Sequence, residues 1–224
     1  MLSMVLGALT AFSQSSLKNP DLVYGFDPLL YNGKVYAYYT MPGTEGTQYL
    51  FDTFDTMGSL TVRGVTFARI TLNFDICNQQ LIMKYKSTIG ASSLIEISKA
   101  WLEKFEIDGR HFEIIATSDT TKEIYQVLGA GPSKIMYYQT KKLLLNTLIA
   151  SKNYFFSHIQ KGMYVFNGKQ RIKYKNNRSF VAVFNPAQQD MIRKYIRKHK
   201  LIVQKVSDLQ MTDLINYCNT LTGT

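Results

Sequence analysis

Cysteine is scarce in this chain, with only Cys77 and Cys218 among 224 residues. At most one disulfide could form, and the absence of a Cys-x-x-Cys pair excludes that spacing of zinc ligands. Cys218 follows Met211, Leu214 and Ile215 at the spacing of one helix face, where a small buried hydrophobe belongs. We therefore expect both thiols to be structural.

Histidine is also scarce, and the three present, His111, His158 and His199, are scattered along the chain. No HExxH pattern brings two of them to metal-ligand spacing, and no GxSxG marks a nucleophile elbow. The glycine-rich stretch 129–134 lacks the spacing of a phosphate-binding loop, so we expect a turn between strands there. The sequence thus predicts no metal site, no cofactor and no catalytic residue.

Acidic pairs leave an enzymatic alternative open. Asp52 with Asp55, or Glu103 with Glu106, could serve acid–base chemistry. Such pairs are common, and catalytic carboxylates are recognised by their environment and not by their spacing. The alternative is a hydrolase-type enzyme with a pocket in the β-rich part of the chain.

Acidic residues are nearly absent from one long segment. Between Lys134 and Lys205 there are 16 basic residues and one acid, Asp190, whereas the rest of the chain holds ten basic and fifteen acidic residues. The formal net charge of +10 is therefore local, at +15 in this segment and −5 elsewhere. Such a field attracts nucleic acid, anionic glycans, lipid head groups or acidic protein faces in a salt-dependent way. A basic face that only keeps the protein soluble is the alternative.

Tryptophan is limited to one residue, while 15 Tyr and 13 Phe are present. Aromatic rings in this excess favour strands. With 46% hydrophobic and 19% charged residues the chain can bury a core, which excludes a disordered or low-complexity protein. We expect one or two compact domains rich in β-structure.

The amino terminus carries an apolar run, MLSMVLGALTAFSQ, that is too short to span a bilayer. The small residues Ala11 and Ser13 precede a cleavage position before Gln14, as in a secretory signal peptide, although the basic start of such a peptide is missing. We expect residues 1–13 to be a signal peptide truncated at its start, and the protein to be periplasmic, extracellular or on the cell surface. A buried first strand or helix is the alternative.

Residues 21–175 consist of short apolar or alternating runs separated by turn signals, the pattern of a meandering antiparallel sheet. Asn-Gly and Arg-Gly pairs predict three hairpins, because they supply residues with positive φ. These hairpins span Leu29–Tyr39, Leu60–Phe67 and Met163–Tyr174. Further predicted strands are Ile70–Ile76, Leu81–Lys86, Ser93–Ile97, His111–Ala116, Glu123–Leu128 and Ile135–Gln139.

After Lys175 the apolar period becomes helical, and side chains able to cap helices precede each segment. The predicted elements are a short helix from Asn176 or Asn177 to Phe184, a helix begun by Asn185 and Pro186 and ending near Lys200, a strand Leu201–Val206, and a helix from the capping box Ser207–Gln210 to about Thr220. The predicted fold class is α+β, with a mainly antiparallel β body in residues 20–150. A basic hairpin and helices in residues 151–224 then form a cap, packed on the body or as a small separate subdomain.

Two groups of residues in this chain resemble parts of a known group of proteins. In the body they are the strand Ile70–Ile76, the polar turn Asn78–Gln80 and the strand Leu81–Met83; toward the carboxyl end they are Asn167–Lys169, Ser179–Phe180, Phe184, Ile192–Ile196 and Lys200. Over most of residues 20–220 the chain resembles a group of uncharacterised exported proteins of Bacteroidota, which join a β-rich body to a carboxyl-terminal hairpin, a short helix and a Lys-rich helix. The resemblance implies a periplasmic or cell-surface setting and supplies no activity.

These observations predict a non-enzymatic envelope protein with a cationic face for an anionic envelope component or an acidic protein surface. Ten basic residues would form the contact set if the fold places them on one side. They are Lys169, Arg171, Lys173, Lys175, Arg178, Arg193, Lys194, Arg197, Lys198 and Lys200. Nucleic-acid binding is a further alternative, because rings such as Tyr154 and Tyr174 accompany the cations, although strand alternation explains them as a buried face.

Overall fold

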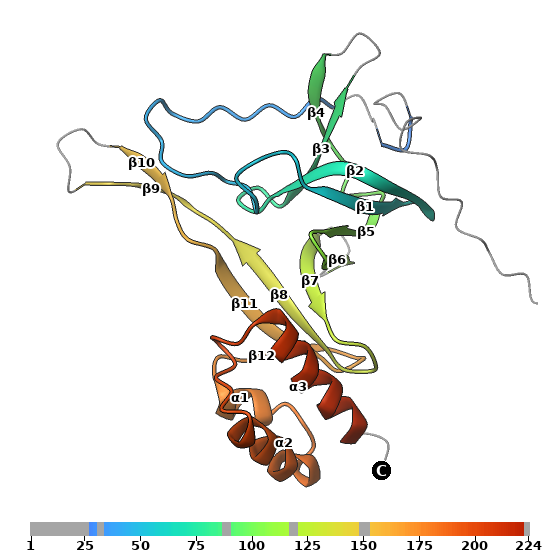
Figure 1. The fold of residues 1–224 in the computed structure, drawn as a ribbon, viewed down its shortest axis with the longest axis vertical. Coiled ribbons are helices and arrows are strands. Elements are labelled where there is room, and N and C mark those ends of the chain that lie inside the picture. Colours follow the sequence, from blue (N-terminus) through green and yellow to red (C-terminus); the bar gives the residue numbers. More distant parts are fainter. Residues whose placement is uncertain (1–26, 31–33, 87–90, 117–120, 148–152, 222–224) are drawn as a thin grey trace, which may run out of the picture.

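The computed structural model describes residues 27–30, 34–86, 91–116, 121–147 and 153–221. This part of the chain is mostly antiparallel β-sheet, with three helices toward the carboxyl end (Figure 1). The strands are β1 (Met57–Val62), β2 (Val65–Asp75), β3 (Gln80–Lys86), β4 (Ser92–Glu96), β5 (Leu102–Ile107), β6 (Arg110–Ala116), β7 (Lys122–Leu128), β8 (Lys134–Thr140), β9 (Leu143–Leu145), β10 (Tyr154–Phe156), β11 (Gln160–Phe166) and β12 (Arg171–Lys173). The helices are α1 (Asn177–Val181), α2 (Pro186–Lys198) and α3 (Asp208–Thr220). The predicted signal peptide, residues 1–13, lies outside the described residues.

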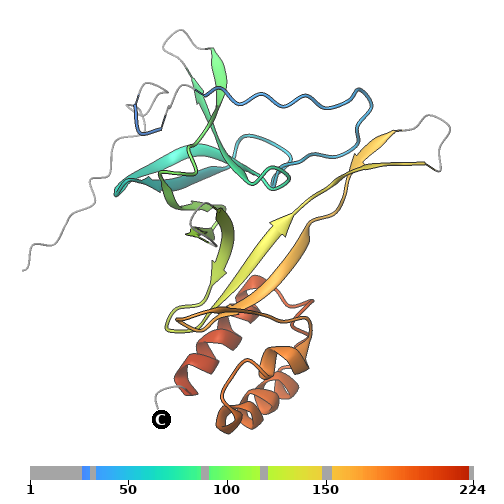
Figure 2. The same ribbon diagram turned by 180° about the vertical axis from the view of Figure 1, so that it is seen from behind.

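Ten of the strands form one sheet in the order β12-β11-β8-β7-β6-β5-β1-β2-β3-β4. Two hairpin series meet in its middle, because β5 returns from the β4 edge to pair with β1. β9 and β10 form a separate two-stranded ribbon that prolongs β8 and β11 away from the helices (Figures 1 and 2). Since β11 pairs with β8, the sheet continues across residue 150 and joins the two regions that the sequence distinguishes.

The predicted hairpin Leu60–Phe67 is confirmed. β1 and β2 pair up to Val62 and Val65, and the two residues between them, Arg63 and Gly64, have φ values of 49° and 76°. Positive φ at both central positions is what a type I′ turn requires, and its twist matches that of the paired strands. The six further predicted strands are also present, in β2, β3, β4, β6, β7 and β8.

The other two hairpin predictions have different outcomes. β11 and β12 do pair, but the turn is displaced by one residue: the Asn167 side chain accepts hydrogen bonds from Lys169 N (3.1 Å) and Gln170 N (3.0 Å), and Gly168 takes the positive φ. The hairpin Leu29–Tyr39 is wrong. Leu29 and Leu30 lie in a turn, and residues 34–36 instead pair with β4; the pair Asn32-Gly33 lies outside the described residues.

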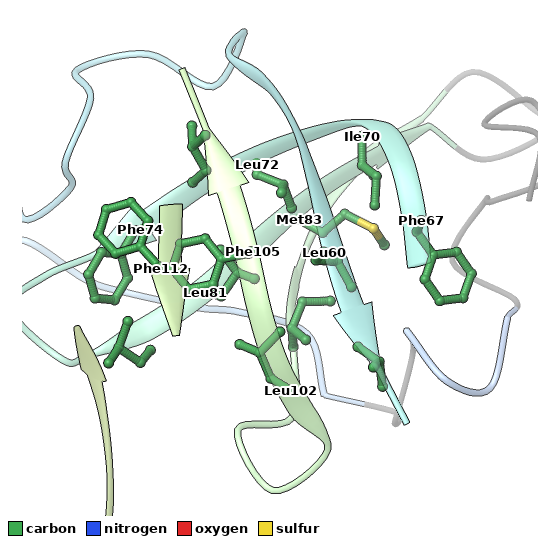
Figure 3. Close-up of a cluster of buried hydrophobic side chains, with 14 of the residues drawn as sticks. Leu60, Phe67, Ile70, Leu72, Phe74, Leu81, Met83, Leu102, Phe105 and Phe112 are labelled. Carbon is green, nitrogen blue, oxygen red and sulfur yellow. The ribbon is translucent and has the colours of Figure 1, made fainter. Parts of the chain in front are cut away.

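One buried cluster spans β1 to β7, and three of its phenylalanine rings pack together (Figure 3). Phe105 and Phe112 stack with centroids 4.7 Å apart, and Phe74 meets both edge-on at 5.7 Å and 5.6 Å. Burying a side chain of this size contributes about 1.5–3 kcal/mol relative to exposure. This cluster therefore anchors the centre of the sheet.

A second buried cluster lies on the same face of the sheet, under the helices. Phe112, Gln126 and Tyr137 are direct cross-strand partners in β6, β7 and β8, so their side chains share one face. Tyr137 belongs to the second cluster, in which β7, β8 and β11 meet all three helices. Its largest contributors from the helices are Phe180, Ile192, Ile196, Met211, Leu214 and Ile215.

A polar seam separates the two clusters. Gln126, 1% exposed, donates from Nε2 to Asp208 Oδ2 (2.6 Å) at the start of α3 and accepts a hydrogen bond from Gln139 Nε2. Gln79, in the β2–β3 turn, donates to the Gln139 carbonyl at 2.8 Å. Because buried amides need partners, this seam fixes how α3 meets the sheet.

The helix predictions are confirmed in their starting residues. Asn176 and Ser179 form a capping box at α1, Asn185 with Pro186 begins α2, and Ser207 with Gln210 forms a capping box at α3. The buried face of α3 consists of Met211, Leu214, Ile215 and Cys218, as the sequence spacing predicts. α2 ends two residues before Lys200.

The predicted strand Leu201–Val206 is wrong, because the segment is a loop. Asn177 donates to the Leu201 carbonyl (2.8 Å) and accepts from Val203 N (2.9 Å), so a side chain takes the backbone groups that a strand would use. Lys205 N and Val206 N then both donate to the Ile202 carbonyl, which closes a turn. Leu201 and Val203 are buried at alternate positions, which is the pattern of a strand and explains the wrong prediction.

Candidate anion-binding site

Helices α1 and α2 lie at one end of the molecule, beyond β12 (Figure 1). Both begin at a capping asparagine, and the rings of Phe180 and Phe184 meet between them with centroids 5.3 Å apart. Ile192 and Ile196 are the buried residues of α2, and Tyr195 stacks on Tyr217 of α3 with ring centroids 4.3 Å apart. The two helices are thereby fixed side by side.

A hollow of about 240 Å³ lies between α1 and α2 and is lined by three arginines. Arg178 comes from α1, and Arg193 and Arg197 come from successive turns of α2. Val181 and Ile196 are buried and form its base. We call this site the arginine hollow; Asn177 completes its lining.

The guanidinium groups of the arginine hollow are exposed and carry a net positive charge. Arg193 Nη1 lies 2.6 Å from Asp190 Oδ1 and its Nη2 donates to Gln189 Oε1 at 2.9 Å. Arg197 Nε donates to the Arg193 carbonyl at 3.4 Å. Guanidinium groups hydrogen-bond oxyanions in a planar, two-pronged geometry, so three of them around one hollow suit carboxylate, phosphate or sulfate groups.

The ten predicted cations do not form one surface. Arg171 lies on the opposite face of the sheet, where its Nη1 is 3.3 Å from Glu123 Oε2 and its guanidinium lies 5.0 Å from the centre of the Tyr125 ring. Burial and the hydrogen bond to Glu123 raise the pKa of Tyr125. Lys173 alternates with buried Tyr174 and so faces the same side as Arg171.

The remaining predicted cations do not line the arginine hollow. Lys194 and Lys198 each follow an arginine of the hollow by one residue, which turns them about 100° around α2. Lys200 comes after the end of α2, Lys175 precedes the α1 cap, and Lys169 lies in the β11–β12 turn. All five are exposed. Sequence reasoning identified the arginines but could not show that Arg178 lies across from Arg193 and Arg197.

The β body carries shallow polar hollows that test the enzymatic alternative. Ser59, Glu106 and His111 are direct cross-strand neighbours on β1, β5 and β6. All three line a hollow of about 290 Å³, and Ser59 and Glu106 also line one of about 300 Å³. Glu106 occupies the middle strand, which puts Ser59 and His111 two strand spacings apart, about 9.5 Å. His111 Nε2 instead lies 3.3 Å from Glu113 Oε1. The His111 imidazole therefore lies against Glu113, and Glu106 stands between it and Ser59 in the sheet.

The other acidic pairs are engaged in local structure. Asp52 and Asp55 accept hydrogen bonds from Thr47 and Thr53, and Glu103 accepts from Gly64 N (2.8 Å) in the β1–β2 turn. Within the described residues no three His, Cys, Asp or Glu side chains are grouped to hold a metal ion.

The glycine-rich stretch 129–134 is a turn between β7 and β8, as predicted. Ala130 N and Ser133 N donate to the side-chain oxygens of Asn216 (2.9 Å) and Asn219 (3.0 Å) on α3. These two backbone donors are therefore used to dock the last helix and do not face a ligand.

Both cysteines are free. Cys218 is buried, and burial raises the pKa of its thiol to about 12. Cys77 is half-buried, and burial together with the nearby charge of Asp75 raises its pKa. Thiols with raised pKa values are poor nucleophiles, so neither one supplies a reactive site.

Comparison with known proteins finds no matching family model, no matching curated protein and no matching solved structure. Among the described residues, no helix combines the length and the apolar composition needed to cross a membrane.

Proposed function

We propose that the protein is a non-enzymatic, exported envelope protein that binds an anionic partner through the arginine hollow. The partner is an anionic envelope component or an acidic protein surface. The observation that carries this proposal is the convergence of Arg178, Arg193 and Arg197 on one hollow, in a segment whose single acid is Asp190. The finer fold assignment belongs to the same proposal: an α+β protein in which the β11–β12 hairpin and the helices form a cap on the sheet.

Electrostatic attraction and geometry both favour this ligand class. The exposed lysines of the same basic segment add long-range attraction, which raises the rate of encounter with an anion and is screened by salt. The arginines add short-range, charge-assisted hydrogen bonds, which are roughly twice as strong as neutral ones. Binding should therefore weaken as salt is added and should depend on the three arginines more than on net charge.

The rings that accompany the cations favour partners other than single-stranded nucleic acid. Tyr174 and Phe156 are buried, and Tyr164 packs against Tyr125 with centroids 5.9 Å apart. Stacking of bases needs exposed ring faces. A partner recognised by its oxyanion groups fits the arginine hollow better.

Export rests on the apolar run before Gln14 and on the resemblance given above. The test restores the missing basic start by adding a short Lys-containing segment before Met1 and expresses this chain in a bacterium. We expect the protein outside the cytoplasm, with a mass that corresponds to a chain beginning at Gln14. Recovery of the uncleaved chain in the cytoplasm would overturn this part of the proposal.

The binding experiment compares two variants of equal net charge on a heparin column, with heparin as a defined polyanion. In the first variant Arg178, Arg193 and Arg197 are changed to Gln. In the control Arg63, Arg69 and Arg110, which belong to the β body, are changed to Gln. We expect the first variant to elute at clearly lower salt than the control. Equal shifts in both would show that retention depends on net charge alone and would overturn the proposed site.

A further inference from the structure

A second hollow lies between the sheet and the loop that joins α2 to α3. Its walls are β8, β11 and residues 203–206, and its volume is about 500 Å³. This is about twice the arginine hollow and falls in the range of small-molecule sites, about 300–1,000 Å³. We call it the loop hollow. Its lining includes Tyr137, Ile159, Lys161, Met163, Lys205 and Val206.

The loop wall of this hollow is held in place before any ligand arrives. Asn177 binds the backbone at Leu201 and Val203, and the turn that follows is closed by two hydrogen bonds to the Ile202 carbonyl. Val203 is 1% exposed and anchors the loop in the second core. A preformed site costs less ordering on binding than a flexible one.

The lining is more polar than apolar: an apolar patch lies beside two cations and other polar groups. Ile159 is exposed, and Met163 and Val206 are half-buried, so apolar surface is available to a ligand. Lys161 and Lys205 bring ammonium groups from opposite walls, β11 and the loop. Tyr137 is buried below, with Lys161 Nζ 4.8 Å from its ring centre.

Lys161 can turn to a ligand without leaving a buried charge alone. Its Nζ lies 3.6 Å from Asp208 Oδ1, a long ion pair. Asp208 Oδ2 also accepts a 2.6 Å hydrogen bond from Gln126, and Asp208 stands in the first turn of α3, where the helix dipole favours a carboxylate. The carboxylate therefore keeps its support when Lys161 moves.

We propose that the loop hollow binds a small amphipathic carboxylic acid. The carboxylate is held by Lys161 and Lys205, and the aliphatic chain lies against Ile159, Met163 and Val206. An anion without an apolar body would leave this surface in water, and an alkylammonium would be repelled by both lysines.

The test uses the full protein chain and octanoate. Acetate, which has the carboxylate without the alkyl chain, and octylammonium, which has the alkyl chain with the opposite charge, are the matched control ligands. Octanoate binding is measured by calorimetry and mapped by amide NMR shifts. We expect octanoate to shift resonances of β11 and residues 203–206, and acetate and octylammonium to cause no such shifts. Lys161→Gln should weaken octanoate binding by about tenfold, the loss of one charged contact. Lys169→Gln, the same change in the β11–β12 turn, should leave binding unchanged.

A second variant blocks the hollow without changing its charge. Val206→Phe adds volume to the loop wall and should abolish octanoate binding while the NMR spectrum of the sheet stays that of the folded protein. The triple arginine variant described above should bind octanoate as the unmodified chain does, which distinguishes this site from the arginine hollow. Equal binding of octanoate and octylammonium, or equal loss in Lys161→Gln and Lys169→Gln, would overturn the proposal.

Discussion

Arg171 Nη1 lies 3.3 Å from Glu123 Oε2, across the sheet face that the helices leave uncovered. Arg171 is therefore paired with an acid and does not line the arginine hollow. We expect Arg171→Gln to leave heparin retention close to that of the unmodified chain, because its charge is already matched. The free energy of unfolding should fall by less than about 1 kcal/mol, as for other partly exposed ion pairs. A salt shift as large as that of Arg197→Gln would show that Arg171 contributes to the anion site.

Gln126 links the two halves of the buried face, and its replacement should destabilise the protein measurably. Gln126→Leu removes the donor to the half-buried Asp208 Oδ2 and the acceptor of Gln139 Nε2, so the buried Gln139 amide loses this partner. We expect the free energy of unfolding to fall by about 1–3 kcal/mol. Chemical denaturation of Gln126→Leu and of Gln160→Leu, an exposed position on β11, measures the difference. Equal stability of the two variants would contradict a structural role for the seam.

Local signals in the sequence sufficed for the Arg63-Gly64 turn and for all three helix starts. Arg63-Gly64 and Ser207–Gln210 work through neighbours within three residues, so no distant contact can override them. β5 was missed because its buried residues, Leu102, Phe105 and Ile107, do not alternate. A register shift opposite β1, between Thr61 and Val62, accounts for that spacing. Such a bulge depends on the partner strand and cannot be predicted from the β5 sequence alone.

The candidate site was predictable only in its residue types. Arg193 and Arg197 lie one turn apart on any helix, whereas their position opposite Arg178 follows from the packing of α1 on α2. The loop hollow had no sequence signal, because residues 201–206 alternate like a strand and only the hydrogen bonds of Asn177 make them a loop. Contacts between distant segments decided both cases.

The two thiols should differ in their rate of alkylation. Cys218 is buried and its pKa is raised to about 12, so almost no thiolate is present at pH 8. Cys77 is half-buried with a raised pKa and should react slowly but detectably. Mass spectrometry after iodoacetamide treatment should show one modification, at Cys77, in the folded protein and two after denaturation. Modification of Cys218 under native conditions would contradict the packing of α3.

Alkaline pH should unfold the protein, and Tyr137 is one cause. Burial raises the pKa of Tyr137 to about 12, from a usual value near 10. The unfolded chain therefore loses this proton first, so the stability that Tyr137 contributes is complete below pH 10 and is lost between about pH 10 and 12. The slope for one such group is about 1.4 kcal/mol per pH unit. Tyr137→Phe should reduce the slope of unfolding free energy against pH, whereas Tyr39→Phe, at an exposed position, should not. Identical slopes would contradict this assignment.

Gly129 should be harder to replace than Gly109, because two separate demands meet there. Its φ is +86°, which costs a non-glycine residue about 1–2 kcal/mol, and a Cβ atom at this position would overlap the Ile215 Cγ2 methyl group of α3. Gly109 has a φ of +68° with no atom within 4 Å of a Cβ, so Gly109→Ala carries the backbone cost alone. Overpacking adds about 1–3 kcal/mol, so Gly129→Ala should be less stable than Gly109→Ala by that margin in denaturant unfolding. Since Asn216 and Asn219 bind the backbone of the same turn, the added methyl group cannot be relieved by moving α3 without breaking those hydrogen bonds. Equal losses in the two variants would mean that α3 does not pack on the turn in solution.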